Sequence, residues 1–237
     1  MARRKKQAED LGPDAFQAEG GRWVGWFEKN GVLVVAGLGV VLLGIVGFEF
    51  LGSSSNRAAS EVTSAFDDAL ERYREVTAPG FARTATSTRV LQEAYAEAQD
   101  ELSSFRDAHA GNGATRLALV YEADLASKRE DYEAAARLYT EYVQAAPADD
   151  PLLFVALEGA GYAYESLEKY DEAVQTFEAL AKVEYAEAYA HKHIARVKEA
   201  KGDLEGAKQS LERLLDSEPT PFLENFAKNH LKLLSAR

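Results

Sequence analysis

Four histidines are the residues with the clearest potential for chemistry, because the chain contains no cysteine. Without cysteine there is no thiolate nucleophile, no thiolate metal ligand and no disulfide. His191 and His193 stand two residues apart in a helical pattern, so they point about 160° away from each other and do not converge on a metal. The phosphate-binding glycine loop, the GxSxG serine motif and the HExxH zinc motif are absent. The sequence therefore predicts no catalytic residue, no metal site and no cofactor.

The chemistry that remains is recognition, and an internal repeat places the side chains that would perform it. Three segments, residues 130–135, 169–173 and 202–207, share one pattern of small and large side chains that ends in an alanine. Ala173 and Ala207 are 34 residues apart, whereas Ala135 and Ala173 are 38 apart, so about four residues are inserted, most simply at 148–151. A period of this size in a helical sequence is typical of stacked helix pairs.

These segments resemble the tetratricopeptide repeat (TPR), a pair of helices that stacks with its neighbours into a solenoid. The alanine is expected where the two helices cross, and a small residue lies twelve positions before it, namely Ala123, Gly161 and Ala195. The aromatic residue or leucine four positions after the alanine is expected to fill the gap to the next repeat. The first helix of the second repeat has Tyr164 at its usual aromatic position, where the first and third repeats have Ala126 and Lys198, so these two repeats are degenerate. A generic array of helical hairpins is the alternative.

In a TPR stack the first helix of each repeat lines a concave groove. The repeat positions give ten candidate partner-binding residues: Leu117, Val120, Asp124, Val155, Glu158, Tyr162, Glu165, Tyr189, Lys192 and Arg196. Tyrosine beside mixed charge suits an extended or poorly folded peptide, because aromatic area gives affinity and polar groups give tolerance. The alternative is that Tyr162 and Tyr189 pack between repeats.

An uncharged apolar run at residues 31–48 predicts a transmembrane helix over residues 31–52. At about 1.5 Å per residue the run reaches about 27 Å, close to the roughly 30 Å hydrocarbon thickness of a bilayer. Basic residues are concentrated before it, in the run 3–6 and at Arg22 and Lys29, so the positive-inside rule places the N-terminus in the cytoplasm. A cleaved signal peptide is the alternative, although its apolar core is usually only about 7–15 residues long.

Charge is distributed unevenly between residues 1–52 and the rest of the chain. The formal net charge is −12, and residues 1–52 contribute none of it because they carry six basic and six acidic side chains. An acidic C-terminal part argues against nucleic-acid binding, which needs a basic face. From residue 56 onward the apolar period is helical and no segment alternates as a strand does. We therefore expect an all-α fold.

The order of these parts resembles the bacterial ancillary SecYEG translocon subunit family, of the YfgM type. The similarity covers residues 22–237 and rests on the segment WVGWFEKNG at 23–31, the apolar span, the degenerate TPRs and a last helix after Thr220 and Pro221. It implies a single-pass bacterial inner-membrane protein with a periplasmic C-terminal domain. It also implies association with Sec translocon subunits and a membrane-anchored periplasmic prolyl isomerase, and transfer of emerging polypeptides to periplasmic chaperones. The family offers no catalytic residue and no small-molecule substrate.

Together these observations predict four parts. Residues 1–30 are a largely disordered cytoplasmic tail with interfacial aromatics, and residues 31–52 are the transmembrane helix. Residues 53–110 form two leading helices, and residues 111–237 form an α-solenoid of three TPR-like repeats with a C-terminal capping helix. The predicted function is a membrane-tethered periplasmic TPR adaptor. The alternative is a structural TPR subunit of another envelope assembly, such as cell-division, pilus or outer-membrane machinery, because a fold does not name its partner.

Overall fold

A computed structural model describes residues 56–85 and 87–236, and all regular structure in these residues is helical. The predicted tail and transmembrane helix, residues 1–52, lie outside the described residues. Within the described residues, no helix combines the length and the apolar character that a membrane crossing needs. The predicted all-α fold is confirmed for this part of the chain.

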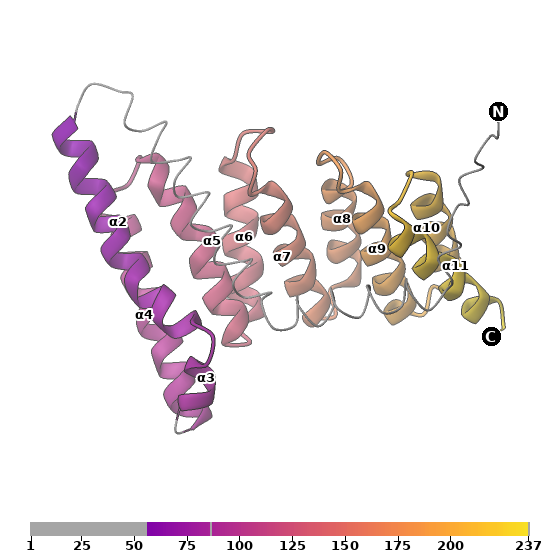
Figure 1. Ribbon diagram of the computed structural model, residues 1–237, viewed down its shortest axis with the longest axis horizontal. Coiled ribbons are helices and arrows are strands. Elements are labelled where there is room, and N and C mark those ends of the chain that lie inside the picture. The colour runs from indigo at the N-terminus through magenta and orange to yellow at the C-terminus, as the bar shows by residue number, and fades with distance from the viewer. Residues whose placement is uncertain (1–55, 86, 237) are drawn as a thin grey trace, which may run out of the picture. The chain divides into compact units, whose positions relative to one another are not determined.

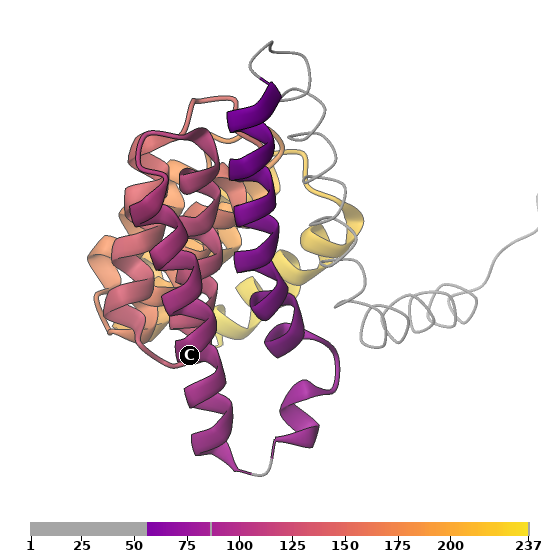
Figure 2. The same ribbon diagram turned by 90° about the vertical axis from the view of Figure 1, so that its left-hand side faces the viewer.

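The helices follow one another in chain order across Figure 1. Each helix from α4 onward packs against the next one, and α5 also contacts α7 as α9 contacts α11. Figure 2 looks along the stack from the α2 end, with the later pairs behind α2 and α4. The pairs α5–α6, α7–α8 and α9–α10 are the three predicted repeats, and α11 is the predicted capping helix. The bounds are α2 Asn56–Thr77, α3 Phe81–Thr84, α4 Thr88–Ala108, α5 Gly113–Lys128, α6 Tyr132–Ala145, α7 Leu153–Ser166, α8 Tyr170–Leu180, α9 Glu187–Lys201, α10 Leu204–Asp216 and α11 Pro221–Ser235.

The turn inside each repeat uses the same backbone conformation at the same repeat position. Glu130, Glu168 and Gly202 are left-handed, with φ of 61°, 57° and 87°. Glycine reaches this region without steric cost, whereas in the two glutamates the Cβ comes close to the following carbonyl oxygen. In the first and third repeats the next residue, Asp131 or Asp203, caps the second helix by accepting a backbone N–H bond. The turn is thus set by position in the repeat and not by glycine alone.

Small residues at the helix crossings confirm the predicted register. Ala135, Ala173 and Ala207 are all fully buried. At Gly161 an added Cβ would lie 2.4 Å from Cε1 and Cζ of Phe177, so the space beside this glycine is filled by the aromatic ring of the same repeat. The glycine is therefore required by the ring four residues after the crossing alanine.

The aromatic side chains also reach the next repeat, as predicted. The Phe177 ring stacks on His193 of α9, with centroids 4.9 Å apart. One repeat earlier, the Tyr139 ring lies 2.5 Å from where a Cβ on Gly159 of α7 would stand. Gly159 and His193 are 34 residues apart and occupy the same repeat position. The gap between repeats is thus closed by a ring that meets either a glycine or another ring.

The inserted residues 148–151 form a loop that is tied to the first repeat. The Tyr142 hydroxyl donates to Asp150 Oδ1 at 2.6 Å, and the Leu152 N–H donates to the same oxygen at 2.9 Å. Arg116 Nη2 lies 3.5 Å from Asp150 Oδ2. These contacts explain why a tyrosine stands at 142, where the repeat commonly has alanine: its hydroxyl anchors the insertion.

Candidate functional site

The ten predicted groove residues lie on α5, α7 and α9, the first helices of the three repeats. The 34-residue step pairs Val155 with Tyr189 and Tyr162 with Arg196 at equivalent places on α7 and α9. Val155, Tyr162 and Tyr189 keep 45%, 40% and 41% of their surface exposed. This section of the face therefore presents apolar and aromatic side chains that the fold itself does not cover.

The centre of this face is built around His193, which is almost fully buried. Its Nε2 lies 3.1 Å from Glu158 Oε1, and its Nδ1 lies 3.4 Å from the Tyr162 hydroxyl. A neutral imidazole that carries its proton on Nε2 satisfies both contacts, because it donates to the carboxylate and accepts from the phenol. The ring also stacks on Phe177. His193 therefore joins α7, α8 and α9 at one point.

Sequence reasoning missed this role, because it tested the two histidines of α9 only as metal ligands. The available signal was the repeat position: His193 is equivalent to Gly159, where the preceding repeat's aromatic ring arrives. A polar ring at that place must find partners on the neighbouring repeat or remain unsatisfied. Among the described residues, no group of three or more His, Cys, Asp or Glu side chains is placed to hold a metal ion.

A second contact lies beside the first and also joins α7 to α9. Arg196 Nη2 forms an ion pair with Glu165 Oε2 at 2.7 Å, and its guanidinium lies 4.8 Å from the centre of the Tyr162 ring. Burial raises the pKa of Glu165, and the Arg196 charge opposes that effect. Burial also raises the pKa of the Tyr162 phenol, with the Glu158 charge as the next cause. Tyr162 is thereby held in place while part of its ring stays exposed.

Toward the N-terminal end the predicted groove residues are covered. Val120 is only 8% exposed and packs in the core of the first repeat, so the prediction that it faces an open groove is wrong. Its apolar side chain was the signal, because the equivalent residues in the next repeats, Glu158 and Lys192, are charged. Asp124 accepts a hydrogen bond of 2.9 Å from the hydroxyl of Tyr73 on α2 and pairs with Lys128 at 3.3 Å. Leu117 is half-buried.

Toward the C-terminal end the face continues onto α11. The Lys192 ammonium lies 5.5 Å from the centre of the Phe226 ring. Tyr189 meets the ring of Phe154 edge-on, with centroids 6.3 Å apart. His230 of α11 bonds to Glu199 of α9. The capping helix therefore extends the groove face as well as closing the core.

Three of these polar contacts share one sequence separation. Tyr162 with His193, Glu165 with Arg196 and Glu199 with His230 are each 31 residues apart. A residue 31 positions on lies one helical turn before the equivalent place in the next repeat, which is 34 positions on. The first helix of one repeat is thus shifted along the first helix of the next by about one turn, and polar residues 31 positions apart come into contact. We call these three contacts the groove ladder.

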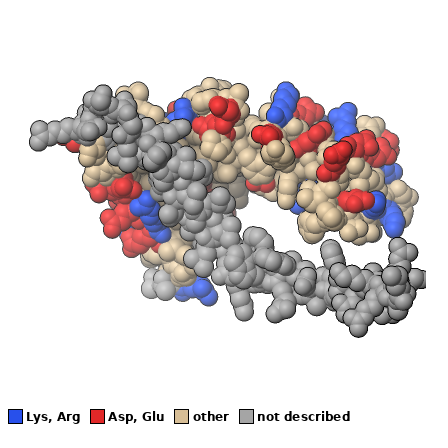
Figure 3. Space-filling model, turned by 45° about the horizontal axis from the view of Figure 1, so that its top comes forward, with Lys and Arg blue, Asp and Glu red and all other residues tan. Residues whose placement is uncertain are grey.

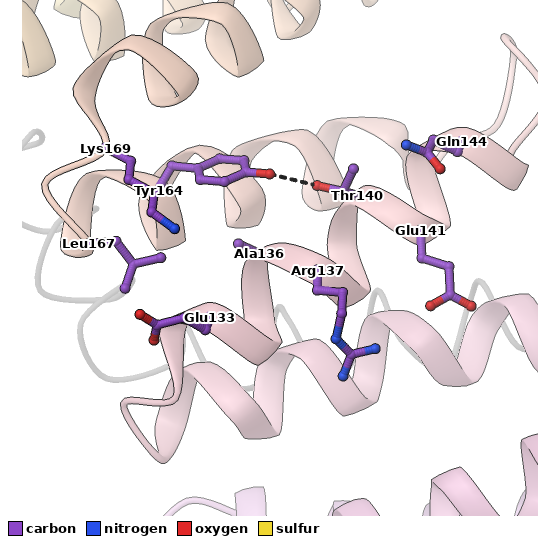
Figure 4. A pocket seen from close by; sticks show the side chains of 9 residues that line it. All are labelled: Glu133, Ala136, Arg137, Thr140, Glu141, Gln144, Tyr164, Leu167 and Lys169. Atoms are coloured by element: carbon purple, nitrogen blue, oxygen red, sulfur yellow. Dashed lines mark hydrogen bonds between the residues drawn. The ribbon is translucent and has the colours of Figure 1, made fainter.

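A hollow beside the repeats lies away from the ladder. It has a volume of about 520 Å³ and is lined by α6 and by the turn between α7 and α8 (Figure 4). Tyr164 and Thr140 share a hydrogen bond of 3.3 Å across it, while Arg137 and Glu141 line its α6 side. It contains no nucleophile beside a base, so its residues give no arrangement for catalysis.

Solved structures with a similar fold include a TPR protein. A tetratricopeptide repeat protein from Parabacteroides merdae ATCC 43184 superposes with a TM-score of 0.54 at 12% identity, over 73% of this chain and 61% of that one. This chain therefore spans about three fifths of that protein's length. The structure described as the MamA RS-1 ArsTM double mutant superposes with a TM-score of 0.51 at 16% identity, over 72% of this chain and 85% of that one.

The likeness to these structures shows the fold alone, since the sequences are so different. No curated protein matches the chain. The Tetratricopeptide repeat-like domain family matches residues 25–193, well over half of the chain, and the chain therefore belongs to this family.

Proposed function

We propose that this chain is a non-catalytic adaptor that binds segments of other proteins on the groove face of α7, α9 and α11. TPR solenoids typically act as scaffolds for protein interaction and present an extended concave surface. One observation carries the proposal: Val155, Tyr162 and Tyr189 are exposed on successive first helices while the polar residues between them are engaged with each other. Exposed aromatic side chains on a rigid scaffold are the usual anchors of a protein interface.

The finer proposal is that the adaptor is tethered to the bacterial inner membrane, with residues 31–52 as a single transmembrane helix. The support is the apolar run at 31–48 and the basic residues that precede it. In this arrangement the N-terminus is cytoplasmic and the TPR part is periplasmic. The proposed partners are Sec translocon subunits, a membrane-anchored periplasmic prolyl isomerase and emerging polypeptides, by resemblance to the YfgM-like family.

Site-directed photocrosslinking in cells tests the groove. A photoreactive amino acid replaces Tyr189 in one variant and Val90 in a control, since Val90 is a 42% exposed apolar residue of α4 that lies off the groove face. We expect protein adducts from position 189 and few from position 90. Equal adducts from both positions, or none from position 189, would count against the groove as the binding surface.

The identity of the adducts tests the partner. Sec subunits or exported chains at position 189 support the translocon adaptor. Components of a cell-division, pilus or outer-membrane machine in their place favour the structural subunit. A reporter enzyme that is active only in the periplasm, fused after residue 237, tests the topology independently: an inactive fusion that is stably produced contradicts the periplasmic placement.

A further inference from the structure

Large exposed apolar side chains lie near the starts of α7, α9 and α11. Val155 is the third residue of α7, Tyr189 the third of α9 and Phe222 the second of α11, and they are 45%, 41% and 71% exposed. Alternate helices of an antiparallel stack run the same way, so their first turns lie along one edge. We call these three residues the apolar strip.

The strip is continuous from helix to helix. Phe154, beside Val155, meets the ring of Tyr189. Lys192, one turn after Tyr189, lies over the ring of Phe226, which is one turn after Phe222. Helices α9 and α11 also pack directly against each other. The strip therefore crosses the helix axes, and its occupant must do the same.

The carboxylates beside the strip already have partners within the fold. Glu158 bonds to His193, Glu165 pairs with Arg196 and Glu199 bonds to His230. Lys192 is placed over an aromatic ring. In Figure 3 both acidic and basic side chains appear on the visible face. A ligand cation would have to replace a hydrogen bond or ion pair that each carboxylate already makes, so it gains little net attraction.

The spacing of the strip gives a repeat for its occupant. Packed helices lie about 8–10 Å apart, and an extended chain in the polyproline II conformation advances about 3.1 Å per residue with three residues per turn. Three residues of such a chain therefore cover one helix-to-helix step and bring the side chain back to the same face. A segment with an apolar side chain at every third position places one beside each of Val155, Tyr189 and Phe222.

We propose that the apolar strip binds an extended, uncharged protein segment with apolar side chains three residues apart. This inference rests on the proposed function and specifies the partner of the same face. It distinguishes the groove from one that captures acidic or basic tails. The net charge of −12 further disfavours acidic segments.

Fluorescence anisotropy with defined peptides tests the inference on the full-length chain in lipid nanodiscs, where no detergent competes for apolar surface. The probes are labelled peptides of about nine residues with three leucines at every third position. One control peptide has the same composition with the leucines adjacent, and two others carry three glutamates or three lysines at the polar positions. We expect the spaced neutral peptide to bind at least about fivefold more tightly than each control, with a Kd that changes less than about twofold between roughly 0.05 M and 0.5 M salt.

Matched variants locate the binding. Val155→Ser and Tyr189→Ser should each weaken the neutral peptide about tenfold. Val90→Ser, which removes an equally exposed valine of α4, should leave its affinity unchanged. Tighter binding of a charged peptide, still lost in Tyr189→Ser, overturns the inference while the groove function stands. Binding that both strip variants leave unchanged overturns both, and failure of every peptide to bind while position 189 still crosslinks partners overturns the inference alone.

Discussion

Replacing Gly161 with alanine tests whether the Phe177 ring at the helix crossing of the second repeat is held in place by the residues of the groove. The new Cβ would lie 2.4 Å from two ring carbons of Phe177, well inside van der Waals contact. The ring cannot simply swing aside, because His193 stacks on it at 4.9 Å and Tyr162 meets it edge-on at 5.9 Å. The methyl group therefore pushes the ring toward the residues of the groove ladder.

Two effects of opposite sign set the size of the change. Overpacking a filled core costs about 1–3 kcal/mol. Replacing glycine by alanine inside a helix stabilises it by about 1 kcal/mol. We expect Gly161→Ala to lower the free energy of unfolding by about 1 kcal/mol, or the melting temperature by about 2–4 °C for a unit of this size.

Urea unfolding of the full-length chain, followed by circular dichroism, measures the effect. A double-mutant cycle with Phe177→Leu isolates the contact, since Gly161→Ala in the leucine background should keep only the helix gain of about 1 kcal/mol. Gly113→Ala is the matched control, because Gly113 opens α5 with no atom near its Cβ position, and it should cost nothing. If Gly161→Ala stabilises the wild-type chain by about 1 kcal/mol, the ring is not held against this glycine.

Three further changes test other parts of the fold. Ala173→Leu should cost about 1–3 kcal/mol in urea unfolding because Ala173 is fully buried at the crossing, and an unchanged midpoint contradicts the register. Arg196→Ala should lower the free energy of unfolding by about 1 kcal/mol at pH 8, because it leaves the Glu165 carboxylate without its ion-pair partner. The loss should be smaller at pH 4, where Glu165 is protonated because burial raises its pKa. An equal loss at both pH values would show that the charge plays no part. Burial lowers the pKa of His191, whose Nδ1 has no hydrogen-bond partner, so the unfolded chain takes up the proton first and stability falls as the pH drops below about 6.5. His191→Gln should flatten thermal stability between about pH 7.5 and 5, and a slope identical to wild type refutes this assignment.

The helix pairs and their crossings could be predicted from the sequence because both depend on residues that are close together in the chain. The period of 34 residues and the small residue twelve positions before each alanine define a helical hairpin without knowledge of its neighbours. A last helix was predicted from Pro221 and the apolar period that follows it, and the structure has a helix at Pro221–Ser235. The expectation that Phe222 points inward was wrong, because this side chain is 71% exposed. The short helix α3 was not predicted, since residues 81–84 form only about one turn.

The groove contacts were harder to predict because they depend on how far one repeat is shifted along the next. A sequence period gives equivalent positions at 34 residues, whereas the groove ladder joins residues 31 apart. That difference is a property of the stacking angle, which no single repeat contains. His193 was therefore judged by its neighbour in sequence, His191, when its actual partners are Glu158 and Tyr162 on the preceding repeat.

The groove ladder also explains why recognition falls to apolar side chains in this chain. Each contact joins consecutive first helices, so the relative placement of α7, α9 and α11 is fixed before any partner arrives. A preorganised surface loses little conformational entropy on binding, and the partner alone must be ordered. The polar groups of the ladder already bond to each other and are not free to bind a partner. Val155, Tyr189 and Phe222 remain exposed, so burying their apolar surface can still contribute free energy to binding. Breaking the ladder contact between Glu199 and His230, neither of which belongs to the strip, should therefore weaken binding at the strip.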